Sequence, residues 1–144
     1  IVYAPDYVIN AGGIINVLSA AALCPIPSMG GYGPSKAATR SLSGCVRAEL
    51  AGQGVDVTLL NPGPYLTGFN DRMADSMWEW FGDESLNAPS TPLFQMMREM
   101  VTGAQMDPAE VVTRMVELTE ADETTENNFV PPGILGDVAD QLGT

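Results

Sequence analysis

The sequence predicts an α/β fold built on a parallel sheet, and three neighbouring segments carry this prediction. Residues 14–18 form a short run rich in β-branched side chains, and residues 55–60 form a second run of the same kind. Between them, residues 34–51 repeat apolar side chains at helical spacing. A strand, helix, strand unit of this type crosses over with a right hand, so the two strands are expected to be parallel.

The chain after residue 106 predicts one more helix and one more strand. Asp107 is a suitable N-cap, Pro108 suits the first turn, and Glu110 stands where a capping box needs it. An apolar stripe follows, which predicts a helix over residues 108–121. Residues 129–130 read as a short final strand. The sheet would then contain three parallel strands.

Residues 68–106 lie between the second strand and this helix and contain both tryptophans and most of the methionines. Two helical faces are expected here, the first from Met73, Met77, Trp78 and Phe81 and the second from Phe94, Met97, Met100 and Val101. Ordinary core packing explains most of these side chains. A soft, Met-rich surface is also suitable for a lid over an apolar substrate, so the segment is a candidate substrate-covering region.

Composition limits the function classes. With 144 residues and 45% hydrophobic content, the chain suffices for a single domain, 1–144. Its formal net charge of −12 argues against binding to nucleic acid or to a membrane surface. There is no histidine and there are only two cysteines, so we expect no metal site and a cytoplasmic location. The apolar stretch 11–27 is interrupted by Asn16 and Pro25 and fits neither a membrane span nor a signal peptide.

One pair of side chains suggests chemistry. Lys36 is the only lysine, and it follows Tyr32 by four residues. In a helix this spacing places both side chains on one face, although most such pairs in proteins are surface or packing pairs. An adjacent ammonium favours the tyrosinate over the phenol, which would help Tyr32 to exchange a proton with a substrate oxygen. Ser19 and Asn61 follow the two strand ends, where ligands of α/β sheets bind.

These residues together resemble the short-chain dehydrogenase/reductase family. The resemblance rests on Asn16-Val17-Leu18-Ser19, on Tyr32 and Lys36, and on the run from Asn61 to Thr67, in the order and spacing of the family. It covers residues 12–72 well and the chain to about residue 132 more loosely. The resemblance implies a Rossmann-like, doubly wound sheet. This chain would contain the last three strands and their helices, the carboxyl-terminal catalytic part, without the first βαβ half.

The resemblance also implies an activity, which is hydride transfer between a nicotinamide cofactor and a ketone or secondary alcohol. Tyr32 would be the acid/base and would also contact the cofactor, Ser19 would hold the reacting oxygen, and Lys36 would assist Tyr32 and bind the nicotinamide ribose. The residues implied to hold the nicotinamide carboxamide are Pro62, Gly63, Tyr65 and Thr67. The cofactor would be NAD or NADP, since the Gly-rich turn and the strand end that select between them have no counterpart here. An apolar substrate and a homo-oligomer are expected.

Two points stay open at this level. Residues 6–9 read either as a strand or, within residues 5–12, as the end of a helix, and Asn10 receives no role. Without earlier strands, residues 14–18 are expected to form an exposed apolar edge. The chain is therefore either part of a working oxidoreductase or a catalytically inactive half-domain that acts only by associating with another chain.

Overall fold

The computed structural model describes residues 7–10, 13–23 and 26–133. They belong to two compact units, divided after Gly63 and after Pro108. We call the part that contains the sheet the sheet unit, and residues 64–108 the helical unit. Each unit is described by itself.

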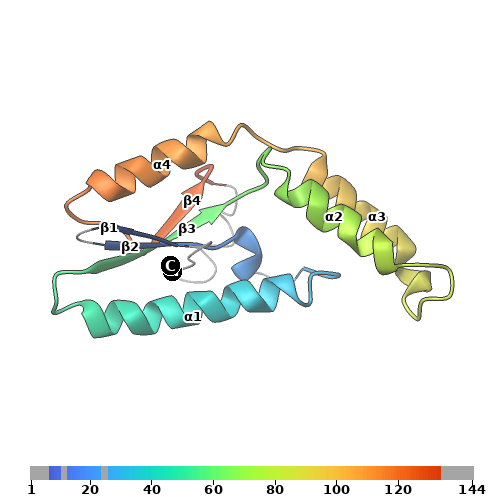
Figure 1. Cartoon of the computed structure of the whole chain (residues 1–144), viewed down its shortest axis with the longest axis horizontal. Helices are drawn as coiled ribbons and strands as arrows, with labels where there is room; N and C mark the ends of the chain where they lie inside the picture. Colours follow the sequence, from blue (N-terminus) through green and yellow to red (C-terminus); the bar gives the residue numbers. More distant parts are fainter. Residues whose placement is uncertain (1–6, 11–12, 24–25, 134–144) are drawn as a thin grey trace. The chain divides into compact units, whose positions relative to one another are not determined.

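The described residues of the sheet unit form four strands in the order β1-β2-β3-β4 (Figure 1). They span Tyr7–Asn10, Gly13–Val17, Asp56–Pro62 and Asn127–Val130. The pairs β2/β3 and β3/β4 are parallel, with Val17 opposite Leu60 and Pro62 opposite Val130. The predicted α/β fold with three parallel strands is therefore confirmed, and each strand lies close to its expected position.

Strand β1 corrects one expectation. It pairs with β2 antiparallel, with Tyr7 opposite Asn16 and Asn10 opposite Gly13. Only two residues separate the strands, whereas a parallel pair needs a crossover of about a dozen residues or more, so a hairpin is the available arrangement. The expectation of an exposed edge at residues 14–18 is wrong, because β1 covers it. Of the two interpretations of residues 5–12, the strand is correct where the structure describes them, and residues 5, 6, 11 and 12 lie outside the described part.

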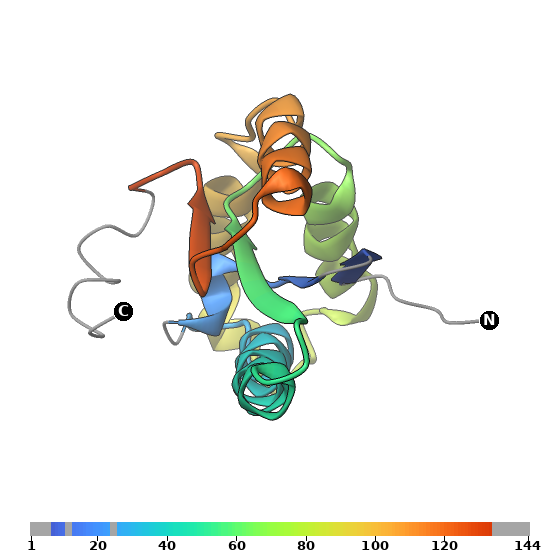
Figure 2. The same cartoon turned by 90° about the vertical axis from the view of Figure 1, so that its left-hand side faces the viewer.

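Two helices cover the two faces of the sheet. Helix α1 (Tyr32–Leu50) lies on one face and α4 (Ala109–Glu120) on the other, as the end-on view shows (Figure 2). Helix α1 begins at Tyr32, two residues before the predicted start, and Pro34 occupies its first turn, where a missing N–H costs little. In β3, Leu59 and Leu60 are only 1% and 0% exposed, and burial of each stabilises the fold by roughly 1.5–3 kcal/mol.

Polar contacts hold α1 on the sheet at two levels. Asn16 of β2 donates from Nδ2 to the Ser43 hydroxyl of α1 at 2.7 Å, and Ser43 donates in turn to the carbonyl of Thr39 at 2.7 Å. Near the end of the helix, the Arg47 guanidinium donates to the carbonyl of Val57 and lies 3.0 Å from a carboxylate oxygen of Asp56. These contacts fix the rotation of α1 about its axis.

A buried amide ties β4 to its neighbours. Asn128 is 4% exposed and donates to the Thr58 hydroxyl of β3 at 2.7 Å, while its oxygen accepts from Arg114 of α4 at 2.7 Å. Because its Nδ2 and Oδ1 atoms are both bonded, the amide is buried without leaving an unpaired group. The last strand is thereby attached to the sheet and to the covering helix.

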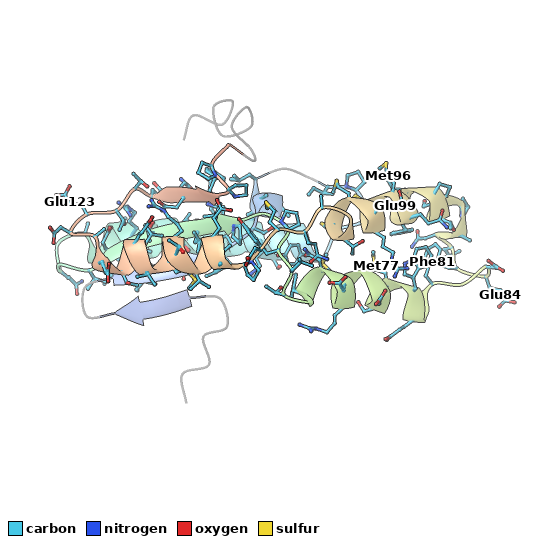
Figure 3. The ribbon with its side chains drawn as sticks, turned by 90° about the horizontal axis from the view of Figure 1, so that it is seen from above. Met77, Phe81, Glu84, Met96, Glu99 and Glu123 are labelled. Atoms are coloured by element: carbon cyan, nitrogen blue, oxygen red, sulfur yellow. The ribbon has the colours of Figure 1, made fainter. Side chains whose placement is uncertain are left out.

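The helical unit contains α2 (Phe69–Trp80), a short helix η2 (Ala88–Ser90) and α3 (Thr91–Thr102). Met77 and Phe81 lie on the side of α2 that faces α3, whereas Met96 points away from α2 (Figure 3). Phe81 packs edge-on against Phe94 with ring centroids 4.9 Å apart. Of the residues expected on one face of α3, Met97 is buried, whereas Met100 is 52% exposed.

The two ends of the helical unit are joined to each other. Tyr65 and Met106 form a parallel bridge, in which Leu66 N donates to Met106 O at 2.8 Å and Met106 N donates to Pro64 O at 3.0 Å. Backbone hydrogen bonds therefore hold the first and last residues of the helical unit together. Among the described residues, no helix is both long enough and apolar enough to cross a membrane.

Candidate active site

Ser19 lies just beyond the carboxyl end of β2. It is the N-cap of a short helix, η1 (Ala20–Ala22), with extended backbone, and its Oγ accepts from the Ala21 N–H at 3.2 Å. The hydroxyl therefore has a structural bond as a cap, and its own proton stays available for an acceptor. Its side chain is half-buried, so it is held in place at the rim of the sheet.

Tyr32 is brought to the same rim by the start of α1. Gly33, its neighbour, approaches the carbonyl of Ala21 so closely that a Cβ at that position would lie 3.3 Å from the oxygen. Glycine thus permits η1 and the first turn of α1 to pack together. Because Ala21 is bonded to Ser19, the segments that carry Ser19 and Tyr32 are adjacent.

Lys36 connects the tyrosine with the strand. Its ammonium lies 5.9 Å from the centre of the Tyr32 ring, within the range of a cation–π contact, and donates to the carbonyl of Val17 at 3.4 Å. Val17 is the last residue of β2, two residues before Ser19. The predicted helical face is therefore observed, and the structure assembles Ser19, Tyr32 and Lys36 around one strand end.

The predicted carboxamide-binding residues are divided between the two units. Pro62 ends β3, and Gly63 N donates to Val130 O at 2.8 Å, so the turn is anchored on β4. In the helical unit, Tyr65 is 5% exposed, while the Thr67 hydroxyl is exposed and accepts from Phe69 N at 3.4 Å. Pro62 and Gly63 belong to the same sheet as Ser19, and Tyr65 and Thr67 stand at the base of the helical unit.

The sequence placed Asn61 after a strand end and gave it no chemical role, whereas the structure places it within β3, next to Pro62. Its side chain is 0% exposed, and neither its Nδ2 nor its Oδ1 atom has a hydrogen-bond partner among the described residues. A buried amide of this kind is uncommon in folded proteins. In the sequence, the only sign of this residue was an asparagine at the end of an apolar strand. An exposed asparagine at a strand end gives the same pattern, so only its burial in the structure distinguishes Asn61.

No cluster of three or more side chains suited to a metal ion occurs in the part of the chain that the structure describes. The strand end brings together the side chains of Ser19, Tyr32 and Lys36. A phenol, an ammonium and a hydroxyl together can exchange a proton with an oxygen atom and stabilise its charge.

Comparison with known proteins places the chain in a family. The model of the short-chain dehydrogenase family matches residues 5–78. The probable oxidoreductase EphD of Mycobacterium tuberculosis is 50% identical over 54 residues, which are 38% of this chain and 9% of that protein. The 2,3-dihydro-2,3-dihydroxybenzoate dehydrogenase of Escherichia coli is 48% identical over 54 residues, 38% of this chain and 22% of that protein.

Solved structures show the same fold. A short-chain dehydrogenase from Streptomyces avermitilis superposes with a TM-score of 0.69 at 19% identity, covering 92% of this chain and 46% of that one. A family member from Burkholderia phymatum in complex with NAD gives 0.66 at 24% identity, covering 93% and 50%. The chain thus spans half, or less, of the length of these relatives. By the family match over residues 5–78, the chain belongs to the short-chain dehydrogenase family.

Proposed function

We propose that this chain is the catalytic part of an NAD(P)-dependent oxidoreductase that transfers hydride between nicotinamide and a ketone or secondary alcohol. The observation that supports this most directly is the position of Lys36, whose ammonium contacts both the Tyr32 ring and the end of β2. The family match and the NAD complex of one solved relative support a nicotinamide cofactor.

Tyr32 is the proposed acid/base. As hydride reaches the carbonyl carbon, negative charge develops on the oxygen, and the phenol delivers its proton there. The Ser19 hydroxyl donates to the same oxygen, which is compatible with the bond that Ser19 already accepts from Ala21 N. The Lys36 ammonium lies beside the Tyr32 ring, where its positive charge would oppose the negative charge that develops during the transfer.

Pro62, Gly63, Tyr65 and Thr67 are the proposed contacts for the nicotinamide carboxamide. The Gly63 turn is fixed by its bond to Val130, which suits a group that must hold a ring in a constant position. The apolar side chains of the helical unit favour an apolar carbonyl compound or alcohol as substrate. We also propose that the protein forms a homo-oligomer and is located in the cytoplasm.

The alternative is that the chain acts as a catalytically inactive half-domain in association with another chain. The chain covers 46% and 50% of the solved relatives, so under this alternative another chain would supply the remaining part of the fold. The two proposals differ in turnover. The first requires activity in the complete natural protein that contains residues 1–144, and the second requires none.

A Tyr32→Phe variant of that complete protein tests the proposed role. We expect a loss of turnover of about 10²–10⁴-fold with apolar ketones, because the proton donor is removed, while nucleotide affinity changes by less than about threefold. Ser41→Ala, an exposed change on the same helix, serves as the control and keeps full activity. Retention of turnover by Tyr32→Phe would remove Tyr32 from the mechanism.

A further inference from the structure

The amide of Asn61 is buried near the carboxyl end of β3 with no hydrogen bond to any described residue. Its side chain is 0% exposed, and both Nδ2 and Oδ1 are unpaired among these residues. Nearly all buried polar groups in folded proteins are paired, either with protein atoms or with ordered water. A partner for this amide is therefore expected inside the sheet unit. The inference concerns the interior of the fold, so it goes beyond the proposed function and does not rest on it.

The pleat of the sheet places the Asn61 side chain on the same face as α1. Asn16 and Leu59 are direct neighbours in the β2/β3 pair, so their side chains share a face. That face is the one covered by α1, because Asn16 donates to Ser43 of this helix. Asn61 follows Leu59 by two residues and therefore lies on the α1 face as well.

A backbone carbonyl beside this amide lacks its ladder bond. Leu18 N donates to Leu60 O at 2.8 Å, which places Leu18 opposite Asn61 in the parallel pair. In a parallel ladder the Leu18 carbonyl would next accept from the N–H of residue 62, but Pro62 has no N–H. Leu18 is only 2% exposed, so its carbonyl lies in the interior. An unpaired donor and an acceptor without its ladder bond therefore lie on facing residues of β2 and β3.

We propose that Asn61 binds a buried water molecule that accepts a hydrogen bond from Nδ2 and donates one to the carbonyl of Leu18. Water suits this position because it is small and both donates and accepts, and buried water commonly pairs polar groups that the protein leaves unpaired. Complete burial of the amide argues against a larger ligand. The carbonyl belongs to the peptide bond between Leu18 and Ser19. The water thus secures the backbone that carries Ser19, whatever reaction that residue serves.

A high-resolution crystal structure of the complete natural protein that contains residues 1–144 tests the proposal directly. We expect a water oxygen within about 2.7–3.2 Å of both Asn61 Nδ2 and the Leu18 carbonyl oxygen. The proposal would be overturned by an Asn61 amide that is bonded only to protein atoms, and equally by an amide without a water that reaches Leu18.

A double-mutant cycle in the same protein measures the coupling between the two groups. Asn61→Leu fills the volume of the amide and its water and leaves the Leu18 carbonyl unpaired, whereas Pro62→Ala restores an N–H that this carbonyl can accept from. We therefore expect Asn61→Leu to lower the urea concentration at the unfolding midpoint. With Pro62→Ala also present, the decrease should be about half as large or smaller.

Asn87→Leu is the matched control for this cycle. Asn87 is exposed and its side chain makes no cap hydrogen bond, so the same chemical change there should leave the unfolding midpoint unaltered. An unchanged or raised midpoint in Asn61→Leu would contradict the proposal. Equal decreases with and without Pro62→Ala would contradict it too, because a leucine that is merely too large acts independently of the Leu18 carbonyl.

Discussion

Lys36, the only lysine in the sequence, contacts the Tyr32 ring and the carbonyl of Val17, and the sequence could predict only the first of these contacts. The spacing of Tyr32 and Lys36 predicted that they share a helical face, and they do, with the ammonium 5.9 Å from the ring centre. The hydrogen bond from Lys36 to the carbonyl of Val17 was not predictable, since it depends on how far α1 lies along β2. The strand end thus positions the lysine, and the lysine in turn restricts the tyrosine.

Asp56 gives a prediction at the scale of one residue. Burial acts to raise the pKa of its carboxyl, but hydrogen bonds from Thr124 and the charge of Arg47 outweigh it and lower the pKa below the ordinary 3.8. A carboxyl with a lowered native pKa stabilises the fold above its unfolded pKa, and this contribution is lost as the pH falls through the native value.

We therefore expect Asp56→Asn to reduce the free energy of unfolding by ~0.5–1 kcal/mol at neutral pH, a small effect because the group is partly solvated. The difference from the original protein should shrink as the pH falls below 3.8. Urea unfolding at several pH values measures it, with Asp122→Asn as an exposed control. A deficit that stays constant down to the lowest pH would contradict the assignment.

At the scale of the element, the position of α1 is determined by polar contacts that sequence patterns do not reveal. Its apolar repeat predicted the helix, but Leu42 of that repeat is 63% exposed. Ser43, a residue that the pattern leaves on no particular face, is 1% exposed and accepts from Asn16. The apolar pattern identified the helix. The hydrogen bond between Asn16 and Ser43 determines which face of the helix lies against the sheet.

Ser43→Ala tests this account of α1. The change leaves the Asn16 amide without its partner, so we expect a loss of about 1–2 kcal/mol in the free energy of unfolding. Ser41→Ala is the matched control, because it makes the same chemical change on the exposed side of the same helix and gains the same helix propensity. If both variants unfold at the same urea concentration, the contact between Asn16 and Ser43 contributes no stability.

At the scale of the whole molecule, the sequence predicted the order and type of the elements better than their pairing. The runs at residues 14–18 and 55–60 are rich in β-branched side chains and have glycines beside them, so both strands could be found locally. The direction of β1 depended on whether residues 7–10 form a strand at all, which the sequence left open; once they do, the two residues between β1 and β2 allow only an antiparallel hairpin. The candidate site followed from spacing, whereas the buried amide of Asn61 became visible only through its burial.

The cofactor gives a prediction for the chain as a whole. A pyrophosphate is commonly bound at a Gly-rich turn that opens a helix, and the sequence contains no such turn before β2. We therefore expect residues 1–144 alone to bind NAD(H) and NADP(H) with dissociation constants of roughly millimolar or weaker. Fluorescence titration with NADH and NADPH measures this. Saturation at micromolar nucleotide would show that the chain holds the pyrophosphate in another way.

The most direct test of the central claim is isotope transfer by the complete natural protein that contains residues 1–144. It is incubated with NADH or NADPH deuterated at C4 and with an apolar ketone such as 2-heptanone, and the alcohol is analysed by mass spectrometry. The account predicts deuterium at the carbinol carbon and its loss in Tyr32→Phe. An absence of deuterated alcohol with both nucleotides and a panel of ketones, from a protein that binds the nucleotide, would contradict it.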